Sequence, residues 1–413
     1  MSEIASSTLL SEGPKMKVSL LTGGGDKPYA LGLLSALHSK GVTVDFIGND
    51  DMSTSELLAD EKVNFFNLRG DQNPRASTLR KIVRVAQYYV QILAYAMGTD
   101  SSIFHILWFN KFIVFDRTLL NLFYKLLGKR LVFTAHNVDD KQRDGNNNAI
   151  NRISLKLLYH IVDHIFVHTP KMRTQLLHEF SLKESKVTVI PFGINNTLPA
   201  TGLTKQEARV KLGLKEYEKV LLFFGHIAPY KGLEYLLKAM HRLKSGNEVF
   251  KLIIAGQVRD CHPYWERLET LVGKLGLRDW VMKRVEYIPD REVEVFFKSS
   301  DVLVLPYKFI FQSGVLFLSY SFGLPVIATD VGSLRDDILD GETGMLCRPE
   351  DSEDLADTIS RYFASDLYRC SGEKARAIIA YANEKYSWDH VAKATLGVYQ
   401  GLANADPGHN SEM

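Results

Sequence analysis

Short apolar runs alternate with longer amphipathic segments along almost the whole chain. The first run, 16–21 (MKVSLL), is followed by the glycines Gly23, Gly24 and Gly25, an apolar helical segment and a second short run, VTVDFIG. A strand, a glycine turn, a helix and another strand form the opening unit of a doubly wound parallel sheet. The pattern therefore predicts an α/β fold from the first residues of the ordered chain.

Similar units fill the first half of the sequence. The strands predicted after the opening unit are 65–70, 103–109, 130–136, 164–169 and 187–195, and the helices between them are 78–97, 118–128, 150–162 and 170–179. A polar segment with Pro and Gly, NTLPATGLTKQEARVKLGL, then indicates an interdomain linker.

The alternation restarts after this linker. The strands predicted in the second half are 219–225, 250–256, 285–289, 301–307 and 324–330, each followed by a helical segment. Short strands separated by helices indicate parallel sheets. The predicted domains are a disordered tail (1–15), two Rossmann-like domains (16–197 and 198–385), a C-terminal helix (386–403) and a second disordered tail (404–413).

Composition narrows the class of protein. The 413 residues are 46% hydrophobic and 24% charged, which is typical of a globular chain with a large core. A net charge of +2 gives no overall attraction to nucleic acid. The three cysteines, Cys261, Cys347 and Cys370, form no CxxC pair and indicate neither disulfides nor a zinc site, so a reducing cytoplasm is expected. The N-terminus lacks the pattern of a signal peptide, and no apolar run reaches the roughly 18–20 residues of a membrane helix.

Two loops at the ends of predicted strands are candidates for anion binding. The turn Gly23–Gly24–Gly25 lets a ligand approach the backbone before a helix N-terminus, although a simple tight turn explains it equally well. The second loop runs from Phe224 to Gly232 and contains His226 and Lys231. A lysine at the carboxyl end of a strand suits a diphosphate, and a solvated loop lysine is the alternative interpretation.

Two further motifs lie at strand ends. Gln312, Ser313, Gly314 and Val315 form a loop-to-helix junction whose free backbone N–H groups favour phosphate, with simple helix capping as the alternative. His136 follows a strand of the first half and is placed for substrate contact. A histidine satisfied within the structure is the alternative interpretation.

The segment 75–130 combines apolar character with positive charge. It contains nine Lys and Arg residues against two Asp residues, and its predicted helix carries bases in the early turns and tyrosines later. This composition predicts a peripheral contact with a membrane. A solvated helix face balanced by acids elsewhere explains it as well.

These motifs together resemble the retaining glycosyltransferases of family 4, which have the GT-B fold. The most specific match is SGVLFLSYSFGLPVIATDVGSLRDDILDGETGMLC (313–347), with a small-residue helix, then G-x-P-V-I-A-T, then G-x-T-G-x-L. The opening GGG, the segment IPFGIN, the loop ending at Lys231–Gly232 and the closing Tyr386–Ser387–Trp388 also fit, so that the resemblance covers about 16–403.

The resemblance implies a function and a set of site residues. The activity is transfer of a sugar from a nucleotide-diphosphate sugar to an acceptor hydroxyl, of hexosyltransferase type, with retention, in polysaccharide or lipid-linked glycan synthesis. The implied catalytic residues are His136 and Lys231. The implied donor-diphosphate residues are Gly24, Gly25, His226, Lys231, Gln312, Ser313, Gly314 and Val315, and those against the nucleotide base are Tyr287, Ile288 and Pro289.

The family also implies the roles of the two halves of the chain. The N-terminal domain is expected to hold the acceptor and the C-terminal domain the donor, and the helix from Trp388 on is expected to cross back to the first domain. The partners are a nucleotide-sugar and a glycan or lipid-linked acceptor. Neither a cofactor nor a metal is expected, nucleic acid is not a partner, and the location is cytoplasmic, at the inner face of the membrane where the basic segment contacts it.

The sequence departs from the family pattern at the phosphate loop and at an acidic pair. His226 stands where the family usually has Arg, and Ile310 and Leu318 stand where it has two Glu residues. The alternative hypothesis is therefore a non-catalytic glycosyltransferase-like subunit that binds a partner. A nicotinamide-dependent oxidoreductase is disfavoured because the first turn is not G-x-G-x-x-G and the second half has its own phosphate loop.

Overall fold

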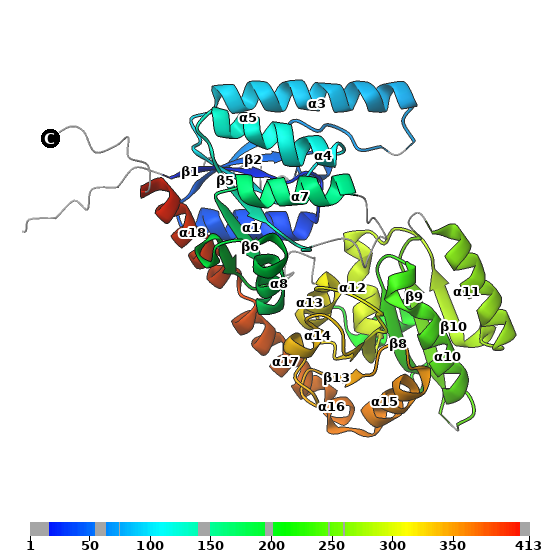
Figure 1. Cartoon of the computed structure of the whole chain (residues 1–413). Coiled ribbons are helices and arrows are strands. Elements are labelled where there is room, and N and C mark those ends of the chain that lie inside the picture. The colour runs from blue at the N-terminus through cyan, green and yellow to red at the C-terminus, as the bar shows by residue number, and fades with distance from the viewer. Residues whose placement is uncertain are drawn as a thin grey trace, which may run out of the picture. The chain divides into compact units, whose positions relative to one another are not determined.

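A computed structural model describes residues 16–53, 63–73, 75–138, 149–194, 201–246, 248–258 and 261–404 (Figure 1). The chain divides into two compact units, each made of separate stretches of sequence. Unit 1 comprises Met1–Thr134, Ile153–Ile165 and Ala392–Met413; unit 2 comprises Ala135–Arg152 and Phe166–Val391. The continuous domain boundaries expected from the sequence, 16–197 and 198–385, stay predictions.

The first sheet has seven strands in the order β3-β2-β1-β4-β5-β6-β7. Neighbouring strands from β3 through β5 pair in parallel. The strands are β1 (Lys17–Leu21), β2 (Thr43–Gly48), β3 (Val63–Asn67), β4 (Ile103–Ile106), β5 (Arg130–Thr134), β6 (His164–Val167) and β7 (Val187–Val189). The order reverses between β1 and β4, which is the switch point where doubly wound sheets bind ligands.

The helices around this sheet begin at capping residues that the sequence supplies. Asp26 accepts a hydrogen bond from the backbone N–H of Tyr29 at the start of α1 (Lys27–Ser39). Ser77 accepts one from the backbone N–H of Arg80 at the start of α3 (Thr78–Gly98). The remaining helices of this half are α4 (Ile113–Phe115), a π-helical turn (Asp116–Leu120), α5 (Asn121–Leu126), α7 (Ala149–Ile161) and α8 (Pro170–Phe180). Right-handed crossovers place α3, α5 and α7 on the same face of the sheet (Figure 1).

The second sheet has six parallel strands in the order β10-β9-β8-β11-β12-β13. They are β8 (Lys219–Phe224), β9 (Phe250–Ala255), β10 (Val281–Arg284), β11 (Val302–Leu305), β12 (Val326–Thr329) and β13 (Gly344–Cys347). The central strands are buried on both faces, as expected for a parallel sheet covered by helices. This confirms the predicted fold of two Rossmann-like parallel-sheet domains.

Helices on both sides of the second sheet complete its core. They are α9 (Lys205–Lys211), α10 (Leu233–Leu243), α11 (His262–Lys274), α12 (Asp290–Ser299), α13 (Gly314–Ser321), α14 (Leu334–Asp337), α15 (Ser352–Ala364), α16 (Asp366–Arg369) and α17 (Ser371–Lys385). The last helix, α18 (Trp388–Asn404), belongs to unit 1 from Ala392 on. Among the described residues no helix is long and apolar enough to cross a bilayer.

Several predicted strand positions were wrong. The strand expected at 285–289 lies earlier, as β10, and the strand expected at 65–70 begins two residues earlier, at Val63. β10 is an edge strand with two exposed residues among its four, so its sequence, VMKR, has no apolar run. The strand expected at 187–195 ends at Val189, and β13 was not predicted at all.

Candidate active site

The loop after β8 is shaped by two glycines with left-handed backbone conformations. Gly225 has φ +95° and Gly232 has φ +63°. A β-carbon at Gly232 would lie 2.1 Å from the carbonyl oxygen of Pro306, so only glycine fits this close approach of two loops. Between the glycines, the short 3-10 turn Pro229–Lys231 carries the lysine back toward the end of the sheet.

The side chain of Lys231 is buried, and its ammonium group lies beside Gly225 and the predicted donor residue Val315. Its Nζ lies 3.2 Å from the position a β-carbon would take at Gly225, and Val315 Cγ2 lies 3.4 Å from the same position. The ring centroids of Tyr307 and Phe223 are 5.4 Å and 6.0 Å from Nζ. The cation is therefore held between aromatic faces, close to the first turn of α13.

The start of α13 supplies backbone hydrogen-bond donors beside this cation. Ser313 is the N-cap residue, but its side chain makes no capping bond to the first turn. The first N–H groups of a helix have no partner within the helix, and they favour an anion. A lysine and a helix start at one point form a site for a phosphate group.

Gln312, two residues before α13, has a buried acceptor. Within the described part of the chain, its Oε1 is buried without a hydrogen-bond partner. The two positions at which the sequence lacks the family's acids, Ile310 and Leu318, are both buried among apolar side chains of the core. Gln312 thus offers a buried, uncharged acceptor in the loop that lacks these acids.

A cavity of about 320 Å³ in unit 2 borders Gln312. Its lining residues are His168, Thr169, Pro170, Val189, Pro191, Phe192, Gln312, Asp336, Asp337, Lys385 and Tyr386. Phe192 joins this cavity to α13, because its ring stacks on Phe317 with centroids 5.3 Å apart and lies 3.9 Å from the position of a β-carbon at Gly314.

His136 is paired with a second histidine that the sequence analysis did not identify. Nδ1 of His136 lies 3.0 Å from Nε2 of His168, and Nδ1 of His168 lies 3.4 Å from the carbonyl oxygen of Ile190. A carbonyl can only accept, so His168 carries its proton on Nδ1 and accepts from His136 Nδ1–H through Nε2. Neutral His136 is thereby fixed in the tautomer whose Nε2 keeps its lone pair.

Burial keeps His168 neutral. Loss of solvation lowers the pKa of His168 from 6.5 to about 4. The hydrogen bond to the Ile190 carbonyl raises the pKa, but by less than burial lowers it. Phe192 packs edge-on against both imidazoles, with centroids 5.0 Å from His168 and 6.2 Å from His136. The structure thus links His136, Gln312 and Gly314 through Phe192 and His168. The sequence signal for His168 was its position directly after β6, which matches that of His136 after β5.

The glycine turn Gly23–Gly25 belongs to unit 1 and is closely packed. Gly23 and Gly24 have φ +53° and +80°. A β-carbon would lie 2.0 Å from the carbonyl oxygen of Trp108 at Gly23 and 1.9 Å from the Trp108 ring at Gly25. At Gly24 it would lie 1.8 Å from Nη1 of Arg69. All three glycines are required by their surroundings.

Arg69 is a site residue that the sequence did not reveal. It is 8% exposed, its Nη2 donates to Asn110 Oδ1 at 3.0 Å, and its Nε and Nη1 are buried without partners within the described residues. Burial lowers its pKa from the ordinary arginine value. A buried guanidinium under an exposed glycine turn favours a negatively charged group on that turn.

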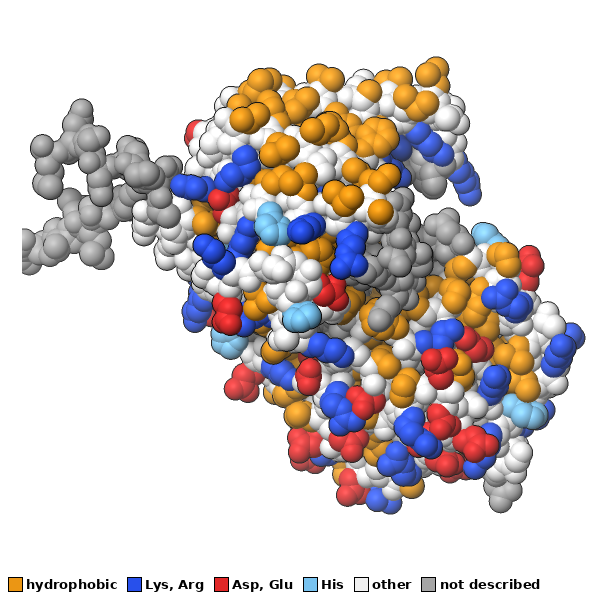
Figure 2. Space-filling view, viewed as in Figure 1, with side chains coloured by type: hydrophobic (Ala, Val, Ile, Leu, Met, Phe, Trp, Pro, Cys, Tyr) orange, Lys and Arg blue, Asp and Glu red, His pale blue; other side chains and the backbone are white. Residues whose placement is uncertain are grey.

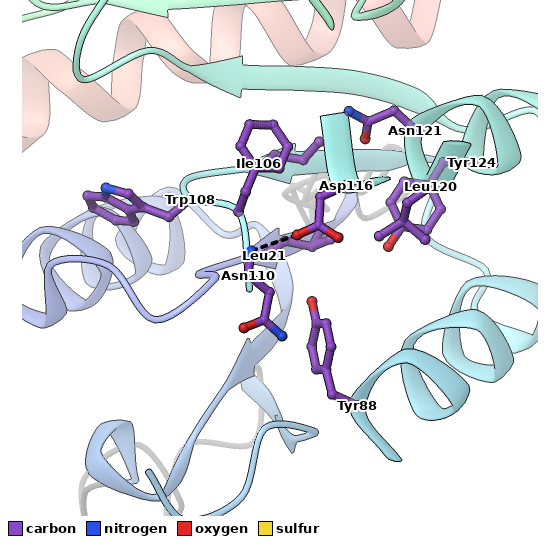
Figure 3. Close-up of a pocket in the computed structure, with 10 residues that line it drawn as sticks. Leu21, Tyr88, Ile106, Trp108, Asn110, Asp116, Leu120, Asn121 and Tyr124 are labelled. Carbon is purple, nitrogen blue, oxygen red and sulfur yellow. Dashed lines mark hydrogen bonds between the residues drawn. The ribbon is translucent and has the colours of Figure 1, made fainter. Parts of the chain in front are cut away.

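A hydrogen-bonded chain holds this arginine in place. The backbone N–H of Asn110 donates to Asp116 Oδ2 at 2.8 Å, as Figure 3 shows, and Tyr89 Oη donates to Asp116 Oδ1 at 2.8 Å. Burial raises the pKa of Asp116. The small pocket beside this chain has a volume of about 20 Å³, room for about one water molecule. It is lined by Leu21, Tyr88, Ile106, Trp108, Phe109, Asn110, Asp116, Leu120, Asn121 and Tyr124.

The remaining predicted site residues differ from Lys231 in their exposure or their place in the fold. Tyr287 is 65% exposed, Ile288 is buried in the core, and Pro289 precedes α12. His226 is exposed at the loop after β8. In the residues that the structure describes, no three His, Cys, Asp or Glu side chains are placed to hold a metal ion.

The whole chain was compared with solved structures. It superposes on sucrose-phosphate synthase from Thermosynechococcus elongatus with a TM-score of 0.74 at 20% identity, covering 95% of this chain and 100% of that one. The catalytic domain of starch synthase IV from Arabidopsis thaliana gives a TM-score of 0.70 at 16% identity, with 95% and 100% covered. The fold is therefore that of the GT-B class of glycosyltransferases.

Comparison of sequences identifies the family within this class. The model "Glycosyltransferase Family 4" matches residues 23–198, and "Glycosyl transferases group 1" matches residues 204–385. The chain belongs to the glycosyltransferases of the family 4 type.

Curated relatives match part of the chain. An uncharacterised glycosyltransferase from Methanocaldococcus jannaschii is 30% identical over 236 residues, 55% of this chain and 57% of the relative. A D-inositol 3-phosphate glycosyltransferase from Acidothermus cellulolyticus is 30% identical over 245 residues, 58% and 53% of the two chains. The chain thus spans just over half the length of these relatives.

Proposed function

We propose that the protein transfers a sugar from a nucleotide-diphosphate sugar to an acceptor hydroxyl, as a hexosyltransferase-type enzyme. The observation that carries the proposal is the buried ammonium of Lys231 beside Gly225 and the start of α13. A point cation and backbone N–H groups at one place stabilise the charge that develops on a departing diphosphate. Solved neighbours of the fold support this donor class: one bears UDP and glucose, and another bears ADP and acarbose.

The proposed mechanism retains the configuration of the sugar and uses no protein nucleophile. Lys231, the α13 amides at Gly314 and Val315, and His226 stabilise the leaving diphosphate. The acceptor hydroxyl attacks from the same face, and its proton passes to a phosphate oxygen. His136 lies near the sugar, where its Nε2 accepts a hydrogen bond in the tautomer fixed by His168.

Gln312 takes part of the role of the two missing carboxylates in this proposal. Its orphaned Oε1 can accept a hydrogen bond from a sugar or ribose hydroxyl without adding negative charge near the diphosphate. The second candidate function is a non-catalytic subunit that binds a partner. The observation that favours it is the burial of apolar side chains at Ile310 and Leu318.

The acceptor and the location are further parts of the proposal. We infer a growing polysaccharide or a lipid-linked glycan as acceptor, in a cytoplasmic protein with a peripheral contact through residues 75–130. The support for this contact is the basic residues that the segment exposes, such as Arg75 and Lys111, together with its many exposed apolar side chains.

The test is thermal unfolding in the presence of UDP, GDP, ADP and dTDP. A nucleotide at 100 times its dissociation constant is expected to stabilise the fold by about 2.7 kcal/mol. Lys231→Ala is expected to abolish the shift because it removes the buried cation. Lys238→Ala is the matched control, since Lys238 is an exposed lysine on α10, the helix that follows the same loop.

Each result has a definite meaning. A shift with one nucleotide, kept in Lys238→Ala and lost in Lys231→Ala, supports the donor site and identifies the base. Release of sugar from the matching nucleotide-sugar then distinguishes an enzyme from a binding subunit. The absence of a shift with all four nucleotides would overturn the proposal in favour of the non-catalytic subunit.

A further inference from the structure

The helices on one face of the first sheet expose an unusual number of large apolar side chains. Figure 2 shows hydrophobic side chains gathered over the area of α3, α5 and α7. Most of the exposed large hydrophobic residues of the described chain belong to these elements of unit 1. They are Leu79, Ile82, Val83, Val90 and Met97 of α3, Phe112 to Phe115, Leu119, Leu122, Leu126 and Leu127, and Ile153 and Leu157 of α7. We call this surface the apolar face.

Helix α3 is apolar on two opposite sides. Its buried side chains, such as Tyr88 and Ile92, follow a spacing of four residues and pack against the sheet. Leu79, Val90 and Met97 form a second stripe on the other side of the helix, and they are 71%, 67% and 64% exposed. A soluble helix normally has one apolar side, which packs on the core, and polar residues on the opposite side. The second apolar stripe of α3 is therefore suited to a partner that removes it from water.

Phe112 to Phe115 present four consecutive apolar residues to solvent. Phe112 is 57% exposed, and Phe115 is 36% exposed. Tyr89 holds the segment in place: its ring stacks on Phe112 with centroids 5.6 Å apart and meets Phe115 edge-on at 5.3 Å. Phe112 N–H also donates to Tyr89 Oη at 3.2 Å. An exposed apolar run that the fold fixes in this way is a functional feature rather than a loose loop.

The helices of the apolar face themselves carry charged side chains of one sign, and the nearby acids Asp71 and Asp163 are paired with Arg84 and Lys125. The sequences of α3, α4, α5 and α7 contain no Asp or Glu, and the Asp116 that follows α4 is buried. Arg75, Lys111 and Lys156 are exposed beside the apolar side chains. Two copies of this chain would bring these bases together at a shared interface, and they would repel. The face is complementary to an anionic, apolar surface.

We propose that the apolar face docks on a bilayer surface that contains anionic phospholipid, with the side chains of Phe112 and Phe115 entering the interfacial region. This proposal specifies the surface and the lipid for the membrane contact of the proposed function. Only the purpose of the contact, access to a lipid-linked acceptor, rests on that function. It also extends the contact beyond residues 75–130 to α7. Helices with an apolar face and bases on the border bind such interfaces without crossing them.

The docking face is connected to the glycine turn within unit 1. Tyr89, which holds Phe112, donates to Asp116, and Asp116 accepts from Asn110. Asn110 in turn accepts from Arg69, which lies under Gly24. A short chain of hydrogen bonds thus runs from the segment that would contact the bilayer, at Phe112, to the glycine turn. This arrangement suits an acceptor that is carried on a lipid.

The experiment is flotation of the full-length protein with vesicles of phosphatidylcholine alone and of phosphatidylcholine with phosphatidylglycerol in equal parts. Binding is expected to the anionic vesicles, and it is expected to weaken as salt is raised because the bases act through screened charge. Replacing both phenylalanines (Phe112→Ser with Phe115→Ser) is expected to lower the partition coefficient by about tenfold or more, because both rings lose the apolar area that they bury in the interfacial region.

Three further variants keep the test decisive. Leu126→Ser, on α5 at 86% exposure, is expected to weaken binding without touching the packed aromatic segment. Val210→Ser is the matched control, because Val210 is 74% exposed on α9 of unit 2. Lys231→Ala is expected to bind vesicles normally, which separates failure of docking from failure of the donor site. Circular dichroism checks that each variant is folded.

Other outcomes overturn the proposal. Wild-type protein that stays unbound with anionic vesicles excludes a lipid surface. Equal loss in Val210→Ser and in the phenylalanine variant shows that the effect is not local to the apolar face. A dimer that dissociates in the phenylalanine variant, together with no vesicle binding, assigns the face to a second copy of the chain.

Discussion

Gly24 and Gly41 have nearly the same backbone conformation but opposite surroundings. Their φ angles are +80° and +82°, yet a β-carbon would lie 1.8 Å from Arg69 at Gly24 and would meet nothing within 4 Å at Gly41. Gly41→Ala therefore measures backbone strain alone, about 1–2 kcal/mol. Gly24→Ala is expected to cost more free energy of unfolding, because it also displaces the arginine. Urea denaturation of both variants measures the difference.

A double-mutant cycle identifies the source of that extra cost. Combining Gly24→Ala with Arg69→Ala removes the group that the new methyl would meet, so the two substitutions are expected to be non-additive, with the double variant less destabilised than the sum. Additive costs would show that Arg69 does not support the turn.

Residue types in loops predicted part of the site, and contacts decided the rest. Lys231, Ser313 and Gly314 follow recognisable motifs, and the structure gathers Lys231 with the start of α13. Arg69 and His168 carry no motif of their own. Their importance comes from neighbours distant in sequence, Gly24 for the arginine and His136 for the histidine, and local pattern cannot report such neighbours.

Between elements, a buried histidine joins the last helix to the first sheet. His105 on β4 lies within hydrogen-bond distance of Tyr399 Oη on α18 through Nδ1, at 2.6 Å, and of Thr134 Oγ1 on β5 through Nε2, at 2.7 Å. All three residues belong to unit 1. The contact of α18 with β4 and β5 is therefore a buried polar one.

The same histidine gives the stability of the protein a defined pH dependence. Burial lowers the pKa of His105 from 6.5 to about 3. Between these values the unfolded chain binds the proton and the folded chain does not, so the free energy of unfolding falls as the pH falls. His105→Gln is expected to reduce the slope by about 1.4 kcal/mol per pH unit. Urea titrations between about pH 4 and about pH 6, within that window, measure it.

His160→Gln is the control for this experiment. His160 is exposed on α7 and takes no part in the buried contact of His105, so it is the matched histidine for comparison. An unchanged slope in His105→Gln would show that the histidine is not held neutral in the folded protein.

The predicted boundaries of strands agreed with the observed ones for fully buried strands and disagreed for a partly exposed strand. β8 and β11 are apolar runs buried in the middle of a sheet, and they were predicted within two residues at each end. The edge strand β10 was misplaced because its polar residues face solvent. Periodicity also identified α3 as a helix, but it does not tell which of its two apolar sides packs on the sheet.

For the molecule as a whole, the proposed chemistry predicts the configuration of the product. With the donor found by the nucleotide screen, the new glycosidic bond is expected to have the same anomeric configuration as the donor, because the acceptor attacks from the face that the diphosphate leaves. Proton NMR of the anomeric signal during turnover measures this. An inverted product would exclude the same-face mechanism and would leave donor binding at Lys231 intact.

The sequence by itself determined the fold class, the two-sheet organisation and the family. Buried parallel strands and glycine turns produce local residue patterns that can be recognised in one sequence. The tertiary structure decided which polar groups meet: the His136–His168 pair, Arg69 under Gly24 and the exposed second side of α3. These features depend on crossovers that bring distant segments to the same place. A pattern of neighbours along the chain specifies what each segment can bury, and only the packed fold specifies what each segment touches.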